Sequence, residues 1–264
     1  MLKSNNSQAG VPTRILVTGA SGGLGEAIAH HYAAPGRTLL LWGRNQERLV
    51  EVAEACRSAG AQAITRSLDL TDSAAAIAAL EEEDDSAPIG LAVFAAGLGD
   101  IRPPDRLVED AAQIIRLGLV NFVAPSAMAA TLASRMAIRR GGRIALIGSA
   151  AAFHALPFAA AYAGSKAGLA RFAEALRLGV AVHGVSVTLV SPGFIDTAAG
   201  RKVSGPKPFL MQPSSVAARI AKATERGQAH LVLPWPFALL RVVERLLPGL
   251  LRDRLLLSLT PPAD

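Results

Sequence analysis

Seven strand-like runs, each followed by a helical pattern, constrain the fold of this chain more than any other feature. The runs are RILVTG (14–19), TLLLWG (38–43), AQAITRS (61–67), IGLAVFAAG (89–97), GGRIALIGS (141–149), GVSVTLVSPG (184–193) and AHLVLP (229–234). Helical patterns lie between them at about 24–34, from 46, and at about 73–83, 107–138, 160–181 and from 213. Apolar strands that alternate with helices are typical of a parallel sheet covered on both sides. We therefore expect an α/β fold with a single doubly wound, Rossmann-type parallel sheet, flanked by helices on both faces.

Three segments differ in composition along the chain. Residues 1–12 are polar and are expected to be flexible, residues 13–234 carry the alternating pattern as one domain, and residues 235–264 form an amphipathic C-terminal extension. No uninterrupted apolar run reaches about 18 residues, so a membrane-spanning helix is not expected.

Charge and cysteine content narrow the class of protein. The formal net charge is +6 and the sequence pI is near 10.1, yet the Lys and Arg residues are mostly single and dispersed, without interleaved aromatic residues. A nucleic-acid partner is therefore not expected. Cys56 is the only cysteine, which excludes an intrachain disulfide and a thiolate-rich metal site. With no signal-peptide core at the N-terminus, we expect a cytoplasmic protein without a metal centre.

The first strand-to-helix turn, TGASGGLG (18–25), has the pattern of a dinucleotide cradle. In this interpretation Gly19 permits the tight turn, Gly23 lets the backbone approach phosphate, and Gly25 allows the helix to pack on the strand. The helix N-terminus presents free N–H groups and a positive dipole end to a pyrophosphate, and the Ser21 hydroxyl can bond the turn or the ribose-phosphate.

The same turn also matches G-x-S-x-G, the nucleophile elbow of a serine hydrolase, with Ser21 as the attacking hydroxyl. An elbow takes an N–H from an earlier strand-to-helix loop, and its acid and His follow later in the chain. Ser21 lies in the first strand-to-helix turn, so no earlier loop supplies the N–H. None of the five His residues stands where the later catalytic His of such a hydrolase is expected. The context therefore favours the cradle.

The end of the second strand indicates which dinucleotide is bound. An NAD-binding chain carries a carboxylate there, about 20 residues after the glycines, to hold the ribose 2′-hydroxyl. This chain instead has Trp42-Gly43-Arg44-Asn45, with no acid. Because a guanidinium can bind a 2′-phosphate through two charge-assisted hydrogen bonds, Arg44 favours NADP(H).

The stretch YAGSK (162–166) places a phenol and an amine on one face of a helix. A nearby ammonium stabilises a phenolate, so we expect Lys166 to lower the pKa of Tyr162 and make it a general acid and base. Ser149 ends the preceding strand on the edge where the loops gather, where its hydroxyl can hold the same substrate oxygen. The structural alternatives are a cap for Ser149, a packing residue for Tyr162 and a surface charge for Lys166.

The ordered set of motifs resembles the short-chain dehydrogenase/reductase family, in its NADP-preferring branch with TGxxxGxG and YxxxK motifs. The resemblance covers the chain to about residue 234. It rests on TGASGGLG (18–25), LDLT (68–71), AAG (95–97), Asn121, Ser149, YAGSK (162–166) and PGFIDT (192–197). It implies that residues 13–234 form a dinucleotide-binding and catalytic domain.

By this resemblance, four residues form the catalytic set. Tyr162 is the acid/base, Lys166 lowers its pKa and binds the nicotinamide ribose, Ser149 orients the substrate carbonyl, and Asn121 supports a water-linked proton relay. Asp69 and Leu70 would contact adenine, and residues 192–197 would cover the nicotinamide. The whole expected cofactor-binding set is Gly19, Ser21, Gly23, Leu24, Gly25, Arg44, Asp69, Leu70, Ala96, Gly97, Tyr162, Lys166, Pro192, Gly193, Ile195 and Thr197.

Two details depart from the simplest pattern. Ala95 stands where the family usually has Asn, so a side-chain hydrogen bond is in doubt there. Pro125 lies four residues after Asn121 within one expected helix, and proline lacks the N–H that would bond the Asn121 carbonyl. The freed carbonyl either accepts a water that feeds Lys166 or reflects a simple kink.

Two loops are expected around the substrate. Residues 150–158 are apolar apart from His154 and should line the pocket. Residues 198–212 lack periodicity and are interpreted as a mobile lid. The cations of this lid, Arg201, Lys202 and Lys207, either steer an anionic substrate or keep the lid solvated.

The extension after residue 234 combines apolar residues with Arg241, Arg245, Arg252 and Arg254, and Pro248-Gly249 divides it. This pattern fits peripheral membrane contact through 235–259, a subunit interface, or a cover on the domain's own core. All three remain open.

The function expected from these observations is an NADP(H)-dependent oxidoreductase that interconverts a carbonyl and an alcohol on a small molecule of apolar character. A homo-oligomer, dimer or tetramer, is also expected from the resemblance. The alternatives are a non-catalytic NADP-binding sensor or scaffold and a serine hydrolase that uses Ser21.

Overall fold

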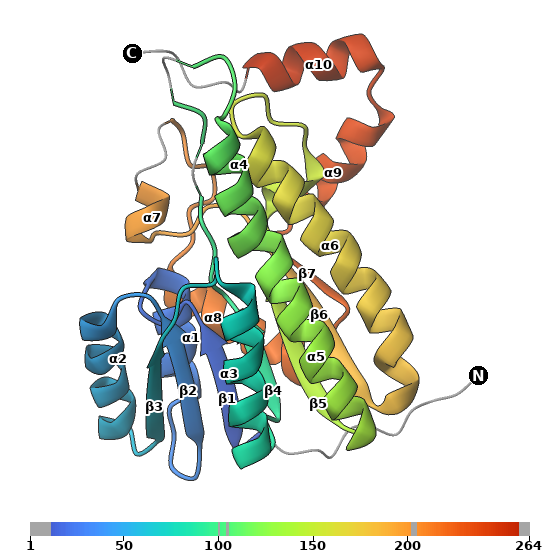
Figure 1. Cartoon of the computed structure of the whole chain (residues 1–264). Coiled ribbons are helices and arrows are strands. Elements are labelled where there is room, and N and C mark those ends of the chain that lie inside the picture. The colour runs from blue at the N-terminus through green and yellow to red at the C-terminus, as the bar shows by residue number, and fades with distance from the viewer. Residues whose placement is uncertain (1–11, 100, 104–105, 202–204, 259–264) are drawn as a thin grey trace.

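The computed structural model describes residues 12–99, 101–103, 106–201 and 205–258. In this part of the chain seven parallel strands form one sheet in the order β3-β2-β1-β4-β5-β6-β7. The strands are β1 (Arg14–Thr18), β2 (Thr38–Gly43), β3 (Gln62–Ser67), β4 (Leu91–Phe94), β5 (Gly142–Ile147), β6 (Val185–Pro192) and β7 (His230–Leu233). The order reverses between β1 and β4, which is the switch point of a doubly wound sheet, so the expected fold class is confirmed (Figure 1).

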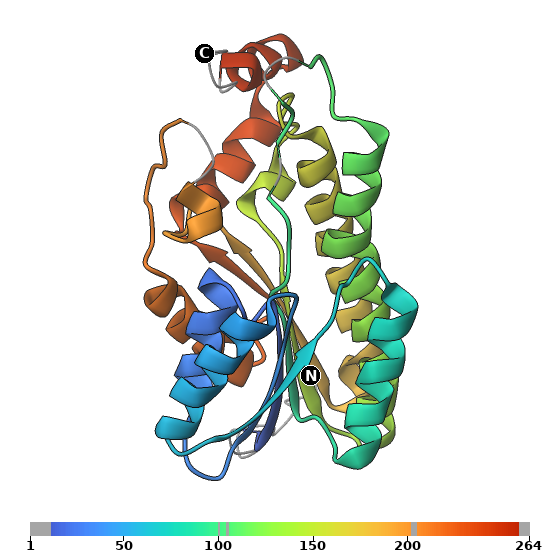
Figure 2. The ribbon, with the colours of Figure 1, turned by 60° about the vertical axis from the view of Figure 1, so that its left-hand side comes forward.

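Helices cover both faces of the sheet, as Figure 2 shows. One layer contains α1 (Gly23–Tyr32), α2 (Gln46–Ser58) and α8 (Pro213–Glu225), and the other contains α3 (Ser73–Ser86), α4 (Ala111–Gly118), α5 (Ala124–Ile138) and α6 (Ala160–Val180). Alternate residues of β1 serve the two layers: Ile15 and Val17 belong to the first core, and Leu16 belongs to the second. The strands are therefore apolar on both faces because both faces are buried.

The helix expected over 107–138 begins at Ala111 and runs to Ile138, but it contains a wider turn. Asp110 caps α4 by accepting a 2.8 Å hydrogen bond from the N–H of Gln113, and a π-helical turn at Leu119–Val123 separates α4 from α5. The N–H of Ala124 donates to the carbonyl of Leu119, five residues back. The next residue, Pro125, cannot donate to Asn121, so the α-helical ladder cannot close at this point. The widened turn replaces the expected kink.

The α4–α5 segment, Ala111–Ile138, is the one described stretch that is long and apolar enough to span a membrane. More than half of its apolar window is buried against the rest of the protein. A core helix of a globular domain meets the same criteria, and this segment packs against α3 and α6.

The 3₁₀ turn η3 (Ala181–His183) directly precedes β6, at the amino edge of the sheet. The other elements gather beyond the carboxyl ends of the strands. They are the 3₁₀ turn η2 (Ala150–Phe153), the short helix α7 (Ala198–Arg201), and the C-terminal helices α9 (Pro236–Leu246) and α10 (Gly249–Ser258). The expected lid contains α7 and is joined at its base by a bridge between Ile195 and Met211, while residues 202–204 lie outside the described part.

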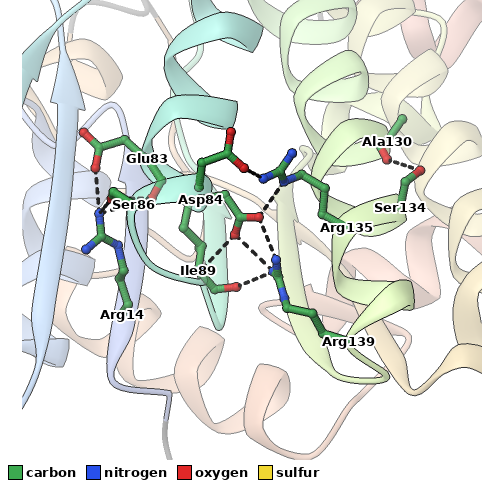
Figure 3. A network of polar contacts seen from close by, with 10 residues as sticks. Arg14, Glu83, Asp84, Ser86, Ile89, Ala130, Ser134, Arg135 and Arg139 are labelled. Atoms are coloured by element: carbon green, nitrogen blue, oxygen red, sulfur yellow. Dashed lines mark hydrogen bonds and ion pairs between the residues drawn. The ribbon is translucent and has the colours of Figure 1, made fainter.

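A polar network at the amino edge of the sheet joins α3 to its neighbour α5 and to strand β1 (Figure 3). The buried carboxylate of Asp84 accepts 2.6 Å hydrogen bonds from both Arg135 and Arg139 on α5, and a 2.8 Å bond from the N–H of Ile89. Its neighbour Glu83 pairs with Arg14 at the start of β1. These contacts hold α3 against α5 and β1, far from the loops at the carboxyl edge.

Candidate active site

A cleft of about 640 Å³ lies at the carboxyl edge of the sheet, between the ends of β1, β2 and β4. Twelve of the expected cofactor-binding residues line it, namely Gly19, Ser21, Gly23, Leu24, Gly25, Arg44, Asp69, Leu70, Ala96, Gly97, Ile195 and Thr197. Its position at the switch point is where doubly wound folds bind nucleotides. The shape and lining of the cleft therefore suit an elongated dinucleotide.

The glycines of the first turn are required by close contacts. Gly19 has φ +71°, and a Cβ there would lie 2.8 Å from backbone atoms of Ala96. A Cβ on Gly25 would lie 2.2 Å from the Gly19 carbonyl oxygen, because the helix starts directly against the turn. A Cβ on Gly23 would lie 2.4 Å from the methyl group of Thr197, so this glycine lets the residue before the lid approach the turn. The backbone at the start of α1 therefore borders the cleft directly.

The N-terminus of α1 suits an anionic group. Its N-cap residue is Gly22, which offers no side-chain acceptor to the first N–H groups of the helix. Unpaired N–H groups and the positive end of the helix dipole attract phosphate. The residues present therefore fit the pyrophosphate of a dinucleotide.

The hydrolase interpretation of the same turn has no support in the geometry. The position of a Cβ on Gly43 would lie 2.5 Å from the Ser21 hydroxyl oxygen, so this side chain lies against the end of β2. None of the five His residues, all of them described, lines the cleft. Ser21 therefore has no imidazole beside it to act as a base.

Opposite charges meet at the β2 end of the cleft. Within the described part of the chain, Arg44 and Asp69 are the only charged residues that line it. The backbone N–H of Thr71 donates to the Asp69 carboxylate at 2.9 Å, and this bond, with the charge of Arg44, holds the pKa of Asp69 below its usual range. Arg44 itself is exposed, so its guanidinium is accessible to a ligand phosphate.

Asn121 is fully buried in the π-helical turn, and its side chain is hydrogen-bonded to the loop after β4. Its Oδ1 accepts from the N–H of Leu98 at 2.8 Å, and its Nδ2 donates to the carbonyl of the same residue at 2.9 Å. A third contact, at 3.3 Å, joins Nδ2 to Ser165 on α6. The side chain therefore fixes the wall of the cleft, and only its backbone carbonyl is left for the expected relay.

Ser149 and Tyr162 meet between η2 and α6. The Ser149 hydroxyl accepts from the N–H of Ala151 at 3.1 Å, as the N-cap of η2, and it is also hydrogen-bonded to the Tyr162 phenol. The Ser149 hydroxyl is therefore the expected cap, and it also lies beside Tyr162, with which it was expected to share a substrate oxygen.

The expected lowering of the Tyr162 pKa by Lys166 is wrong for this state of the protein. Burial raises the pKa of Tyr162, and the hydrogen bond with Ser149 is the one contribution that acts in the opposite direction. Lys166 lies one turn along α6, but its Nζ donates to the carbonyl oxygen of Ile147 at 2.8 Å. Burial lowers the pKa of Lys166 itself to about 8. Desolvation thus sets the direction of both pKa shifts.

The catalytic set and the cleft are neighbours. A Cβ on Gly97 would lie 3.3 Å from both the Asn121 Oδ1 and the Lys166 Nζ. Because Gly97 lines the cleft, these two polar groups lie directly behind its wall. The other four expected cofactor-binding residues, Tyr162, Lys166, Pro192 and Gly193, are not among the described residues that line the cleft. A Cβ on Gly193 would lie 2.4 Å from the Phe237 ring, so this glycine accommodates α9 instead.

Several lining residues were not expected from the sequence. They are Thr18, Gly22, Trp42, Gly43, Leu68, Ala95, Leu98, Val120, Ala198 and Ala199. Most are next to expected residues, so chain proximity was the available signal. The Thr18 hydroxyl accepts from the N–H of Ala96 at 3.2 Å and joins β1 to the turn after β4.

The loop expected to line the substrate pocket instead borders a second, more open groove of about 610 Å³. This groove is lined by residues 152–157 and by one face of α6, and neither Ser149 nor Tyr162 is among them. His154 is its one titratable residue, and burial lowers the His154 pKa. The groove is therefore apolar, but it lies beside the Ser149–Tyr162 pair rather than around it.

Comparisons with known proteins agree with this geometry. A family model described as short chain dehydrogenase matches residues 13–207. An uncharacterized oxidoreductase of Myxococcus xanthus is 30% identical over 241 residues, covering 90% of this chain and 94% of the relative. One from Mycobacterium tuberculosis is 34% identical, with coverages of 89% and 93%. The solved structure of a short-chain dehydrogenase from Sphingobium yanoikuyae in complex with NADPH superposes with a TM-score of 0.77 at 27% identity, covering 91% of this chain and 95% of the other.

Proposed function

Because the chain belongs to the short-chain dehydrogenase family, we propose that it is an NADP(H)-dependent oxidoreductase that interconverts a carbonyl compound and an alcohol. Membership of the family makes the chain an oxidoreductase that uses a nicotinamide dinucleotide. The observation that carries the proposal is the convergence of Ser149, Tyr162 and Lys166 beside a glycine-bordered cleft at the sheet switch point.

The preference for NADP(H) rests on the β2 end of the cleft. Among the described residues that line the cleft, Arg44 is the only cation, and the end of β2 is followed by Arg44 and Asn45 rather than by a carboxylate that could bind a ribose 2′-hydroxyl. Asp69 is at the same end, but its carboxylate already accepts from Thr71. A guanidinium stabilises a doubly charged 2′-phosphate, so the site favours the phosphorylated cofactor. The NADPH complex of the Sphingobium relative supports the same choice.

The chemistry of the site divides between cofactor and protein. The bound dinucleotide would supply or accept the hydride. Tyr162 would give a proton to the substrate oxygen as the carbonyl is reduced, and would take it back in the oxidation. The Ser149 hydroxyl, already bonded to this phenol, would hold the same oxygen. Lys166 would return a proton through the buried polar groups near Gly97 and Asn121.

The substrate is proposed to be apolar. The elements next to Ser149 and Tyr162 are η2, which Ser149 caps, and the start of α6, which carries Tyr162. Alanine dominates the η2–α6 region, with Phe153, Leu156 and Pro157 beside it. Such a wall gives little hydrogen bonding to a polar substrate.

A non-catalytic NADP-binding sensor or scaffold is the second candidate. A protein that only binds the cofactor has no need for a buried lysine beside a serine–tyrosine pair, so the site favours catalysis. The test is to follow NADPH and NADH oxidation with a panel of aldehydes and ketones of increasing chain length. Turnover with NADPH supports the enzyme. Tight NADPH binding without turnover of any member of the panel would favour the sensor.

A cytoplasmic homo-oligomer is proposed as the form of the enzyme. Ile138 on α5, together with Leu178 and Val182 near the end of α6, is exposed although all three are large and apolar. Such residues on neighbouring helices suit a helix-to-helix interface between copies. Light scattering after gel filtration tests this, and cell fractionation tests the location.

A further inference from the structure

A large exposed apolar surface covers the C-terminal helices. We call it the terminal surface, and it consists of Trp235, Leu239, Leu240, Leu246, Leu250, Leu251 and Leu257. These side chains are between 47% and 83% exposed, and they are seven of the nineteen exposed large apolar side chains in the described part of the chain. Single exposed leucines are common on globular proteins, but such a concentration marks an interaction site.

Other exposed apolar residues lie at the same end of the molecule. Leu107 and Val108 precede α4, and Phe209 and Leu210 belong to the lid segment 198–212. In Figures 1 and 2, α9 and α10 lie beyond the carboxyl edge of the sheet, at the end where α4 begins. The exposed apolar residues therefore surround the same end of the domain as the catalytic residues.

The terminal surface is attached to the domain by aromatic contacts at the start of α9. The Phe237 ring packs against Gly193 and lies 6.5 Å from the Phe194 ring and 6.2 Å from the Phe209 ring, measured between ring centroids. Phe194 follows the end of β6, and Phe209 belongs to the lid. The start of α9 therefore packs against both the segment after β6 and the lid.

The charge around this surface is positive. The segment 235–258 contains four arginines against Glu244 and Asp253, and the segment 198–212 contains three cations and no acid. Arg252 and Arg254 on α10 are exposed. In a symmetric dimer formed through this surface, both copies would bring the same excess of positive charge to the interface, which disfavours that arrangement. An anionic lipid surface accepts both the apolar side chains and the positive charge.

We propose that the terminal surface docks this protein on an anionic membrane, with α9 and α10 lying in the headgroup region. The active-site end of the sheet then faces the lipid. This part of the inference rests on the proposed function: the substrate is a carbonyl compound or alcohol carried in the membrane, which reaches the active site from the lipid.

Flotation of the full chain with vesicles tests the proposal. The vesicles are phosphatidylcholine alone and phosphatidylcholine with phosphatidylserine. One variant combines Leu246→Ser, Leu250→Ser and Leu257→Ser, and its control combines Val50→Ser and Ile64→Ser, which are exposed on α2 and β3, away from the terminal surface and from the proposed subunit interface. A charge variant combines Arg252→Glu and Arg254→Glu, with Arg219→Glu and Arg226→Glu on α8 as its control.

We expect the wild type and both controls to float with the serine-containing vesicles, and binding to weaken as salt increases. The leucine variant should bind at least about tenfold more weakly, because the apolar contact is lost, and the charge variant should lose its preference for phosphatidylserine. Absence of wild-type flotation would overturn the proposal. Equal flotation of the leucine variant, or its conversion from an oligomer to a monomer without any lipid binding, would also overturn it.

Activity distinguishes this proposal from the proposed function. With NADPH and a water-soluble carbonyl compound, the leucine variant should retain wild-type turnover because its residues are outside the cleft. With a long-chain substrate presented in vesicles, its rate should fall with its binding. If the protein shows no activity at all, the proposed function fails, while flotation still decides whether the terminal surface binds lipid.

Discussion

The Nζ of Lys166 donates a 2.8 Å hydrogen bond to the carbonyl oxygen of Ile147, the last residue of β5. This bond holds the ammonium between α6 and the strand that leads to Ser149, so the lysine is a fixed part of the site rather than a surface charge. Because the whole group is buried, its pKa falls to about 8. The lysine is therefore able to lose its proton close to neutral pH.

Replacing the phenol should abolish the proton transfer and leave the cofactor in place. Tyr162→Phe should lose about a hundredfold or more in kcat, as expected for a missing general acid, with NADPH affinity nearly unchanged. Stopped-flow turnover and NADPH fluorescence titration measure the two effects. The matched control is Tyr32→Phe, since Tyr32 is the other tyrosine and its buried hydroxyl has no hydrogen-bond partner among the described residues. Full activity in Tyr162→Phe would contradict the assigned role.

The buried lysine should also make stability depend on pH. Burial places the pKa of folded Lys166 at about 8, below its value of about 10.5 in the unfolded chain, so the unfolded state binds more protons between these values. The contribution of Lys166 to the free energy of unfolding therefore rises with pH, by about 2 kcal/mol between pH 8 and pH 10.

Denaturant titrations of the wild type and Lys166→Met across this range measure the effect. The variant should lack the rise, and Lys222→Met, on the exposed face of α8, should keep it. Parallel curves for the wild type and Lys166→Met would show that the lysine is not buried as described.

Arg44 should decide between the two nicotinamide cofactors. Arg44→Ala should raise the KM for NADPH about tenfold or more, because a charge-assisted contact with the 2′-phosphate is lost, and leave the KM for NADH nearly unchanged. Arg48→Ala is the control, since Arg48 is a nearby arginine that pairs with Glu26 and Glu51 outside the cleft. An equal change for both cofactors would argue against 2′-phosphate recognition.

The polar network at the amino edge should matter for stability but not for catalysis. Asp84→Ala leaves Arg135 and Arg139 without their shared carboxylate, and we expect a loss of about 3 kcal/mol in the free energy of unfolding. Although burial opposes it, the hydrogen bonds from both arginines and Ile89 lower the pKa of Asp84. The contribution is therefore present above the unfolded pKa of about 4 and is lost as pH falls through the lower, folded value.

Thermal or denaturant unfolding of Asp84→Ala beside Asp85→Ala tests this prediction. Asp85 is exposed, so its replacement should cost much less, about 1 kcal/mol at most. Equal losses in the two variants would mean that the buried network is not what holds α3 to α5.

The widened turn before Pro125 should tune the catalytic residues. Pro125→Ala restores an N–H that can donate to the Asn121 carbonyl, which allows a regular helix and withdraws that carbonyl from a water relay. We expect turnover to fall several-fold and the pH–rate profile to shift, with folding retained. An unchanged pH–rate profile and turnover would show that the Asn121 carbonyl takes no part in a water relay.

The sequence alone determined the layered α/β fold, because strands apolar on both faces can be buried only between two layers of helices. It also located the glycine turn, Arg44 and the Ser149–Tyr162–Lys166 set, since these depend on local spacing and on the shared carboxyl edge of parallel strands. The tertiary structure alone decided what each group touches. It turned the Asn121 side chain toward Leu98, placed Gly193 against Phe237, buried Lys166 and shielded the Tyr162 phenol from water, so that desolvation sets the direction of both pKa shifts. Burial and long-range packing arise from the whole fold, and no local pattern of residues encodes them.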